Sequence, residues 1–495
     1  MPPPRLRRPD VPARIFVGAT PEVLAPLLED LREQLGISAN FSEQAEQEAA
    51  EAARRTFEAP DRTGIELATI DPPGSKDLDQ ALHIERTPGA GYRVHYAIAA
   101  VGRFVEPGSA LDAEVWERAV TVYGPGRSFP LHPASLSAGA ASLLPGEVRP
   151  AYLWTFELDS AGTALDARVE FVRVRSRAQL TYEQVQFALD GEAPLPAGAP
   201  AELPQLLAEV GERRIAIEAE RGGVSLDIPD QEVVGQGNGY ELQFRATLPV
   251  EGFNAQISLL TGIEAARLMR EAGAGIFRTL PKAQKRDLRR MRLTARALGI
   301  EWPDHYGYPQ FVRSLDSALP AHAAFLVQAT SLFRGSDYLA FTDGAPHDRK
   351  THSAIASEYA HVTAPLRRLV DRYGLEICLA HCEGGAVPAR ILEELPTVPE
   401  AMRSGTSRAN QYERGAVDLI EALILEPHVG ADFGGVVVDV DEEREDREPR
   451  GTLMVPRPAV QARITGGELP LGEEVTAELT QADPETRRVA FRLSH

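Results

Sequence analysis

The stretch TIDPPGSKDLDQALHIER, residues 69–86, carries three aspartates within nine positions, beside two prolines and a glycine. Residues of these types gather in ordinary surface turns for local backbone reasons. They also suit a metal site, because Mg²⁺ typically takes one or two carboxylates together with substrate phosphate and water. An extended backbone points Asp77 and Asp79 to the same side, and the Pro-Pro-Gly turn can fold Asp71 back beside them. This stretch alone does not decide between two interpretations, a surface turn and a metal site.

The length and composition indicate a large globular protein. At 495 residues the chain is too long for one hydrophobic core, so we expect about two to four domains. Hydrophobic residues at 43% and charged residues at 25% are ordinary values for such a protein. No run approaches the roughly 18 apolar residues of a membrane span, and the first residues, MPPPRLRRPDVPAR, lack the apolar core of a signal peptide. We therefore expect a cytoplasmic monomer with no membrane partner.

The formal net charge of -20 argues, taken as a whole, against a nucleic acid partner. The charges are unevenly distributed, however. Basic residues concentrate in 282–296 and 365–372, whereas acidic residues dominate 42–51 and 439–448. This distribution is compatible with a phosphate-binding channel inside an acidic protein. For 282–296 alone, a solvated helix face is the simpler interpretation.

The chain begins with helical patterns and ends with strand patterns. Residues 1–58 predict a small module of two helices, the second of which begins near Asn40 or Ser42. A helix-turn-helix is one interpretation of this module, but the acidic second helix favours a packing or interaction element. Residues 59–425 alternate strands and long helices, and residues 426–495 predict about four or five short strands, typical of a small barrel. The fold class is α+β, with several domains.

Further motifs follow the aspartate stretch in a recognisable order. They are VHYAIAAVGRFVEPGSALDAEVWERAVTVYGPGRSFPLHPASLS (94–137), LPVEGFNAQISLL (248–260) and YAHVTAPLRRLVDR (359–372). Together these motifs resemble the ribonuclease II and R exoribonucleases, whose catalytic region is called the RNB domain. The metal-binding signature of that family is D-x5-D-x-D-D. Asp71, Asp77 and Asp79 match three of its positions, and Gln80 stands at the fourth.

The resemblance implies a domain order. It implies an RNB catalytic domain at 59–425 and an S1-like OB-fold barrel at 426–495, with the helical module 1–58 in the place where well-known members carry cold-shock barrels. An S1 domain commonly binds single-stranded RNA through a basic, aromatic surface. That expectation is weaker here, because the loop at 439–450 is acidic and aromatic residues are sparse.

The resemblance also implies an activity, the metal-dependent 3'-to-5' digestion of single-stranded RNA to nucleoside 5'-monophosphates. Hydrolysis of a phosphodiester needs an activated water, in-line geometry and charge stabilisation, and two Mg²⁺ or Mn²⁺ ions can supply all three. Asp71, Asp77 and Asp79 would bind the ions, with Asp79 also catalytic, and Gln80 could add an uncharged carbonyl oxygen.

Three departures from the family pattern support an alternative class of function. Gln80 and Ala100 stand where the family has aspartates, and Gly252 replaces a family glutamate. Without these charges, the chain could instead be a catalytically impaired member that binds RNA or regulates it. The three remaining aspartates favour the enzyme.

The motif at 359–372 supplies three of the predicted RNA contacts. Arg367 matches the family arginine that stabilises phosphate, since a guanidinium can grip a phosphate with two hydrogen bonds. Arg368 is a second candidate, although an ion pair with Asp371 one helical turn away is the favoured interpretation for it. His361 would contact phosphate or serve a structural role.

The remaining candidates would contact the terminal nucleotide. Tyr123 matches a family tyrosine that packs on the 3'-terminal base, because an aromatic face stacks on any base. Glu251 matches a family glutamate near that nucleotide. Glu413 stands where the family has a ribose-contacting glutamate, which could accept a hydrogen bond from a 2'-hydroxyl and so distinguish RNA from DNA. For both glutamates, a carboxylate on a solvated helix face is the competing interpretation.

Overall fold

The computed structural model describes residues 21–226, 230–236, 239–245, 247–317, 319–348, 350–441 and 448–494. The chain divides into two compact units. The larger unit comprises Leu31–Asp230 and Ala246–Arg414, and the smaller comprises Met1–Asp30, Gln231–Arg245 and Gly415–His495. The domain boundaries expected from the sequence stay predictions. Residues 1–20 of the helical module and 442–447 of the acidic loop lie outside the described residues.

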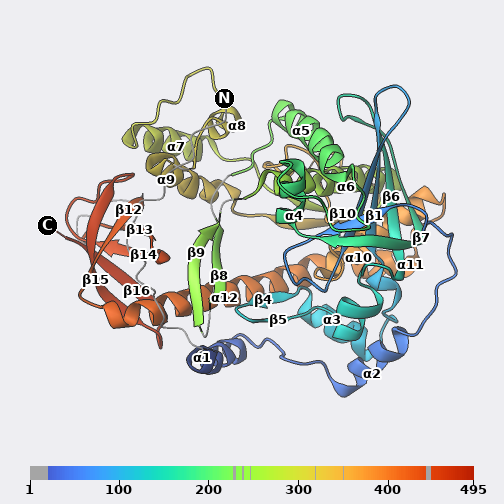
Figure 1. Ribbon diagram of the computed structural model, residues 1–495, viewed down its shortest axis with the longest axis horizontal. Helices are drawn as coiled ribbons and strands as arrows, with labels where there is room; N and C mark the ends of the chain where they lie inside the picture. Colours follow the sequence, from blue (N-terminus) through green and yellow to red (C-terminus); the bar gives the residue numbers. More distant parts are fainter. Residues whose placement is uncertain are drawn as a thin grey trace. The chain divides into compact units, whose positions relative to one another are not determined.

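The larger unit contains a closed five-stranded barrel, seen on the right in Figure 1. Its strands are β1 (Leu67–Ile70), β2 (Gln80–Arg86), β3 (Tyr92–Ala99), β6 (Val148–Leu158) and β7 (Ala164–Leu180). Neighbouring strands are antiparallel except for the parallel pair β1–β7, which closes the barrel. These strands belong to the region 59–425, for which the sequence predicts alternating strands and helices. Trp154 and Phe156 of β6 are fully buried, as expected where aromatic side chains fill a small barrel.

Three long helices of the same unit pack beside this barrel. They are α5 (Leu203–Arg221), α6 (Pro249–Ala272) and α10 (Leu369–Cys382), with α5 against β2 and α6, and α10 against β7 and α6. Gly262 in α6 permits a close approach, because a Cβ atom there would lie 2.1 Å from the Tyr359 ring and 2.6 Å from the Ala360 carbonyl oxygen. The Gly262 carbonyl accepts a hydrogen bond from the Ala360 amide at 3.0 Å. The glycine thus lets the segment before α10 lie directly on α6.

Nine further helices are described. They are α1 (Pro21–Gln34), α2 (Glu43–Ala52), α3 (Ala110–Arg118), α4 (Tyr182–Leu189), α7 (Lys285–Ala297), α8 (Tyr308–Arg313), α9 (Pro320–Ala329), α11 (Ala389–Glu394) and α12 (Val398–Leu425). The predicted helix pair is present as α1 and α2. Ser42 caps α2, because its hydroxyl accepts a hydrogen bond from the Ala45 amide at 3.2 Å. The predicted start of this helix is confirmed.

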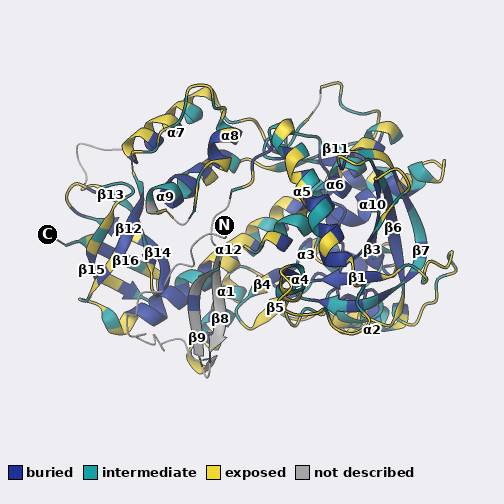
Figure 2. Ribbon diagram, turned by 45° about the horizontal axis from the view of Figure 1, so that its top comes forward, coloured by how far each residue is buried: buried dark blue, intermediate teal, exposed yellow. Residues whose placement is uncertain are grey.

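The smaller unit contains a second closed five-stranded barrel. Its strands are β12 (Asp432–Val440), β13 (Arg450–Pro456), β14 (Ala459–Thr465), β15 (Glu474–Asp483) and β16 (Arg488–Leu493). The strand order is β12-β13-β14-β16-β15, with β14–β16 as the parallel pair, which is consistent with an OB-fold. Val437, Leu453, Leu479 and Phe491 are fully buried. Figure 2 shows buried stretches along the strands of this barrel. The α+β fold class and the terminal barrel are confirmed.

Three two-stranded sheets complete the described architecture. They pair β4 (Val122–Gly124) with β5 (Arg127–Phe129), β8 (Asp230–Gln236) with β9 (Gly239–Arg245), and β10 (Gly275–Thr279) with β11 (Asp337–Phe341). Among the described residues, no helix combines the length and the apolar character needed to cross a membrane.

Candidate active site

The aspartate loop, residues 71–79, joins β1 to β2. Because these strands are antiparallel, the end of β1 and the start of β2 lie at the same end of the barrel. Neighbouring residues hold the loop in place. Gln179 of β7 donates from its side-chain amide to the Ser75 carbonyl at 2.8 Å. The Ser142 hydroxyl donates to the Lys76 carbonyl at 2.7 Å and accepts from the Leu78 amide at 3.0 Å. The loop is therefore held by contacts well beyond those of an ordinary surface turn.

Asp71 has a carboxyl group that is largely withdrawn from solvent. Its Oδ2 atom is buried and has no hydrogen-bond partner among the described residues. Burial raises the pKa of Asp71 from 3.8 to about 6, with a smaller contribution from the negative charge of Asp77. The Thr69 hydroxyl and the charge of Arg367 oppose this rise. A positive ion between the carboxylates of Asp71 and Asp77 would offset both the burial of the Asp71 charge and its repulsion by Asp77. Within the described residues, however, no group of three or more His, Cys, Asp or Glu side chains is arranged to hold a metal ion.

The arginine segment, Thr363–Arg368, meets the aspartate loop from a distant part of the sequence. The Leu366 amide donates to Oδ1 of Asp79 at 2.8 Å, and the Leu366 carbonyl lies 3.2 Å from Nδ1 of the buried His132. The Thr121 amide donates to the Arg367 carbonyl at 3.1 Å. These contacts fix the backbone from which the two arginines project.

Asp79 lies at the junction of the loop and the segment. Its carboxyl group is buried, with Oδ2 at 3.9 Å from Nε of Arg367. Burial raises the pKa of Asp79 well above its usual range, although the charge of Arg367 and the hydrogen bond from the Leu366 amide oppose this effect. The structure thus brings the carboxyl group of Asp79 close to the guanidinium of Arg367.

The two neighbouring arginines have different surroundings. Arg368 donates to both carboxylate oxygens of Asp371, at 2.8 and 2.9 Å, and Asp371 is fully buried. Burial alone would lower the pKa of Arg368, but the charge and hydrogen bonds of Asp371 raise it. The Arg367 side chain is 47% exposed. The ion pair favoured for Arg368 is present, and Arg367 is the arginine available to a phosphate. An RNA contact by Arg368 stays a prediction.

Tyr123 belongs to the β4–β5 hairpin, and its side chain is 40% exposed. Its pKa is raised by burial and by the charge of Asp77, with smaller effects from Arg367, Asp79 and Glu413. These effects place the phenol among the other predicted site residues. The backbone of Tyr123 also hydrogen-bonds the Glu413 carboxyl group, whose pKa is raised by partial burial. The structure therefore brings Tyr123 and Glu413 together at this end of the barrel.

Gln80, the residue at the fourth aspartate position, is engaged in hydrogen bonds on both sides of its amide. Nε2 donates to the Thr363 carbonyl at 2.6 Å, and Oε1 accepts from the Tyr96 hydroxyl at 2.5 Å. The Tyr96 hydroxyl lies 2.8 Å from the hydroxyl oxygen of Ser258 in α6. Assignment of Gln80 as a metal ligand stays a prediction, and the amide has a clear structural use.

Two further predicted residues have partners within the fold. Glu251 accepts a hydrogen bond from the Leu248 amide at 2.9 Å and so caps the start of α6. His361 lies 2.7 Å, through Nδ1, from the Tyr338 hydroxyl. Burial and the nearby Arg368 lower the pKa of His361 well below its usual range, so the ring is neutral at pH 7. A phosphate contact by His361 would therefore be made without a positive charge. Both RNA-binding assignments stay predictions.

Local sequence patterns did not predict that Tyr182 and Asn254 would lie near the site residues. Tyr182 at the start of α4 has its pKa raised by burial, with effects from Asp71, Glu251 and Arg367. Its hydroxyl accepts from the Asn254 side chain at 3.4 Å. A tyrosine in a predicted helix or strand is more often a core residue than a site residue, so no local pattern could identify Tyr182 as a neighbour of the site. Only the register of the strands and the packing of α6 bring such residues to the aspartate loop.

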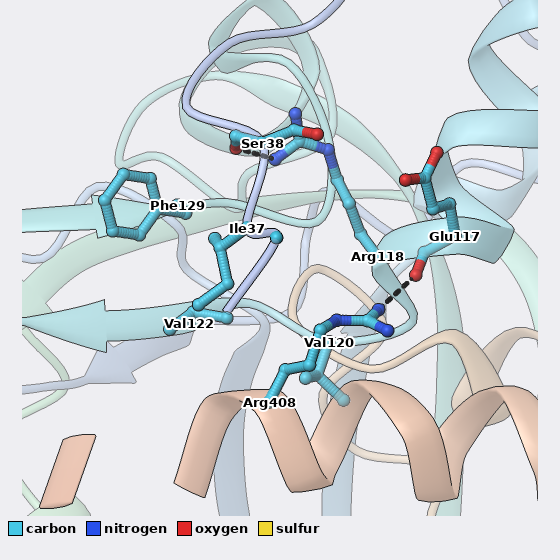
Figure 3. A pocket seen from close by; sticks show the side chains of 9 residues that line it. Ile37, Ser38, Glu117, Arg118, Val120, Val122, Phe129 and Arg408 are labelled. Atoms are coloured by element: carbon cyan, nitrogen blue, oxygen red, sulfur yellow. Dashed lines mark hydrogen bonds between the residues drawn. The ribbon is translucent and has the colours of Figure 1, made fainter. Parts of the chain in front are cut away.

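A separate pocket is lined by residues of the segment joining α1 to α2, of the end of α3, of the β4–β5 hairpin and of α12 (Figure 3). Nine residues line it: Gly36, Ile37, Ser38, Glu117, Arg118, Val120, Val122, Phe129 and Arg408. Arg118 donates to the Ser38 carbonyl at 3.2 Å, and Arg408 donates to the Glu117 carbonyl. Both arginines thus tie the pocket walls together. The sequence did not predict this pocket.

Comparison with known families agrees with the barrel and the motifs. Residues 61–379 match the RNB domain, and residues 431–494 match the C-terminal S1 domain of RNase II-type exonucleases. The chain belongs to the RNB family. The resemblance drawn from the sequence motifs is confirmed.

Curated relatives and solved structures extend this result. Ribonuclease R 1 of Lactococcus lactis is 25% identical over 389 residues, which is 75% of this chain and 46% of that protein. Ribonuclease R of Escherichia coli is 26% identical over 398 residues, covering 77% of this chain and 48% of that protein. The chain spans about half the length of these curated relatives.

The fold is also that of Mycoplasma genitalium RNase R, solved in complex with ribose-methylated single-stranded RNA. The TM-score is 0.83 at 19% identity, covering 94% of this chain and 77% of that chain. Yeast Ssd1, described as a pseudonuclease, aligns with a TM-score of 0.69 at 15% identity, covering 94% of this chain and 57% of that one. The fold therefore occurs in a nuclease and in a pseudonuclease, and the fold alone does not decide activity.

Proposed function

We propose that this protein is a metal-dependent 3'-to-5' exoribonuclease that degrades single-stranded RNA to nucleoside 5'-monophosphates. The observation that carries the proposal is the meeting of the aspartate loop with Arg367, with Oδ2 of Asp79 at 3.9 Å from the guanidinium. Carboxylates for a cation and a half-exposed arginine for a phosphate thus lie side by side. Membership of the RNB family supports the same chemistry.

The residues present fit a divalent cation at Asp71 and Asp77, because the Oδ2 atom of Asp71 is buried without a partner among the described residues and its pKa is raised. We propose Mg²⁺ or Mn²⁺ as the natural ions, with Asp79 completing the acidic surroundings. When bound, such ions would supply an activated water and charge stabilisation at the scissile phosphate.

The chain's own residues would position the substrate. Arg367 would hold a phosphate oxygen pair through its planar guanidinium. The exposed ring of Tyr123 would stack on the terminal base without reading its identity. Glu413, hydrogen-bonded to the Tyr123 backbone, would accept a hydrogen bond from the 2'-hydroxyl and thereby select RNA.

The direct test is digestion of a 5'-labelled single-stranded RNA with Mg²⁺ or Mn²⁺, beside an Asp79→Asn variant and a matched DNA. We expect a descending ladder with RNA that disappears in the variant and with chelator. Asparagine keeps an acceptor for the Leu366 amide, so this variant removes the charge and preserves the junction.

A second candidate function is RNA binding without hydrolysis. It is favoured by two observations: no three-residue metal group within the described residues, and a Gln80 amide engaged by Thr363 and Tyr96. Equal RNA binding with and without chelator, together with intact RNA in every lane, would establish this second function instead.

A further inference from the structure

Gln80 occupies a family metal position, yet its surroundings are those of a structural glutamine. It begins β2 and pairs with Ile98 of β3, so Tyr96, two residues away on β3, lies on the same face. This register explains the 2.5 Å hydrogen bond between the Tyr96 hydroxyl and Oε1 of Gln80.

The chemistry of the neighbours fixes the orientation of the Gln80 amide. The Thr363 carbonyl can only accept a hydrogen bond, so the nitrogen of Gln80 must face it, and the oxygen must face Tyr96. The single proton of Tyr96 is then used on Gln80, and the Ser258 hydroxyl must donate to Tyr96. A chain of three hydrogen bonds therefore connects Ser258 of α6, through Tyr96 and Gln80, to the Thr363 carbonyl of the arginine segment.

An aspartate at this position could not make the same contact. A carboxylate has no proton to donate to the Thr363 carbonyl, and aspartate is one methylene shorter. The buried Thr363 carbonyl would lose the only side-chain donor that it has among the described residues. The departure from the family pattern thus brings a specific gain, a direct link between β2 and the backbone before Arg367.

We propose that Gln80, oriented by Tyr96, is a positioning residue that holds the arginine segment in place for phosphate binding and is not a metal ligand. The proposal rests on the proposed function only in naming phosphate as what Arg367 binds. Thr363, at the start of the segment, is held by Gln80, and Leu366, near its end, is held by Asp79. Loss of either contact would remove one of the hydrogen bonds that fix the backbone beneath Arg367 and so increase its local opening.

A matched pair of glutamines makes the proposal testable. Gln179 donates from Nε2 to the Ser75 carbonyl at 2.8 Å, in the middle of the aspartate loop, whereas Gln80 donates to the arginine segment. Gln80→Met and Gln179→Met remove the same kind of hydrogen bond at nearly constant side-chain volume. Gln44→Met, on the exposed surface of α2, controls for the substitution itself.

The first measurement is amide hydrogen exchange over residues 359–369 and 71–79. Loss of one hydrogen bond corresponds to about a fivefold change in a local opening equilibrium. We expect Gln80→Met to accelerate exchange at Leu366 by about fivefold or more and Gln179→Met to leave it unchanged. Unaltered exchange at Leu366 in Gln80→Met would overturn the proposal, whether or not the protein digests RNA.

The second measurement separates positioning from metal binding. Binding of Mn²⁺ alone is followed by paramagnetic resonance, and binding of a single-stranded RNA is followed in chelator. Gln80→Met should keep the Mn²⁺ affinity within about twofold and weaken RNA binding about fivefold, whereas Gln179→Met should do the reverse. Tyr96→Phe, which removes only the orienting hydroxyl, should act like Gln80→Met with a smaller effect.

The outcomes also distinguish the two proposals. If wild type neither binds Mn²⁺ nor digests RNA, the proposed function fails while the exchange result still decides the role of Gln80. If Gln80→Glu binds Mn²⁺ at least tenfold more tightly than wild type and Gln80→Met binds it tenfold more weakly, Gln80 is a metal ligand and the positioning role is wrong.

Discussion

The two barrels of this protein share a strand number and differ in what surrounds them. Each is closed and five-stranded, with one parallel strand pair. The first is packed by α5 and α10, and its β1–β2 loop meets the arginine segment. The second contains none of the predicted site residues. The comparison teaches that a barrel supplies a scaffold, whereas the candidate site arises where one barrel loop meets a distant segment.

The largest expected effect tests this difference directly. Asp79→Asn or Asp71→Asn should lower the rate of RNA digestion by about 100-fold or more, because each removes a charge aimed at the reacting phosphate or its cation. Asp432→Asn, an exposed aspartate in the second barrel, is the matched control and should leave the rate unchanged. An equal loss of digestion rate in all three variants would show that the aspartate loop has no special role compared with the second barrel.

The next effect concerns stability and pH. The pKa of Asp71 is raised to about 6 from 3.8, so the folded state favours the protonated carboxyl group. That contribution is complete below pH 3.8 and is lost as the pH rises through about 6. In chelator, Asp71→Asn should therefore be more stable than wild type at pH 8, by up to about 3 kcal/mol, with no gain below pH 3.8.

Urea unfolding between pH 3.5 and 8, chosen at about half-unit steps, would measure this effect. Divalent ions should reverse its sign above pH 6, because they stabilise only the form that binds them. If the free energies of unfolding of the variant and wild type differed by the same amount at every pH, the raised pKa of Asp71 would be contradicted.

A third effect separates the two neighbouring arginines. Arg367→Ala should reduce kcat/KM about 30-fold with little loss of stability, because its side chain is half-exposed and would hold phosphate. Arg368→Ala should instead destabilise the protein by about 3 kcal/mol, because it leaves the buried Asp371 without its partner. Thermal unfolding and steady-state kinetics on both variants test the assignment, and a stability loss in Arg367→Ala would reverse it.

The smallest effects belong to the Tyr123 hairpin. Tyr123→Ala should raise the KM for RNA by about tenfold, and Tyr123→Phe should change it little, since stacking needs only the ring. Glu413→Gln should reduce the preference for RNA over the matched DNA by about threefold to fivefold, the effect of one weakened hydrogen bond. A larger loss in Tyr123→Phe than in Tyr123→Ala would rule out stacking as the role of Tyr123.

The sequence by itself determined the local features. The spacing of Asp71, Asp77 and Asp79 and the Arg368–Asp371 pair depend on residues close together in the chain. Local patterns likewise predicted α2 and the terminal barrel. These features follow from backbone geometry and short-range hydrogen bonds, which local patterns encode.

Only the tertiary structure decided which of these residues meet. The hydrogen bonds from Leu366 to Asp79 and from Gln80 to Thr363 join positions more than 280 residues apart. They depend on barrel register and on the close approach that Gly262 permits, neither of which a local pattern contains. For the same reason, the sequence presented Gln80 as an uncharged metal ligand in place of an aspartate, whereas the structure shows its amide hydrogen-bonded to Thr363 and Tyr96.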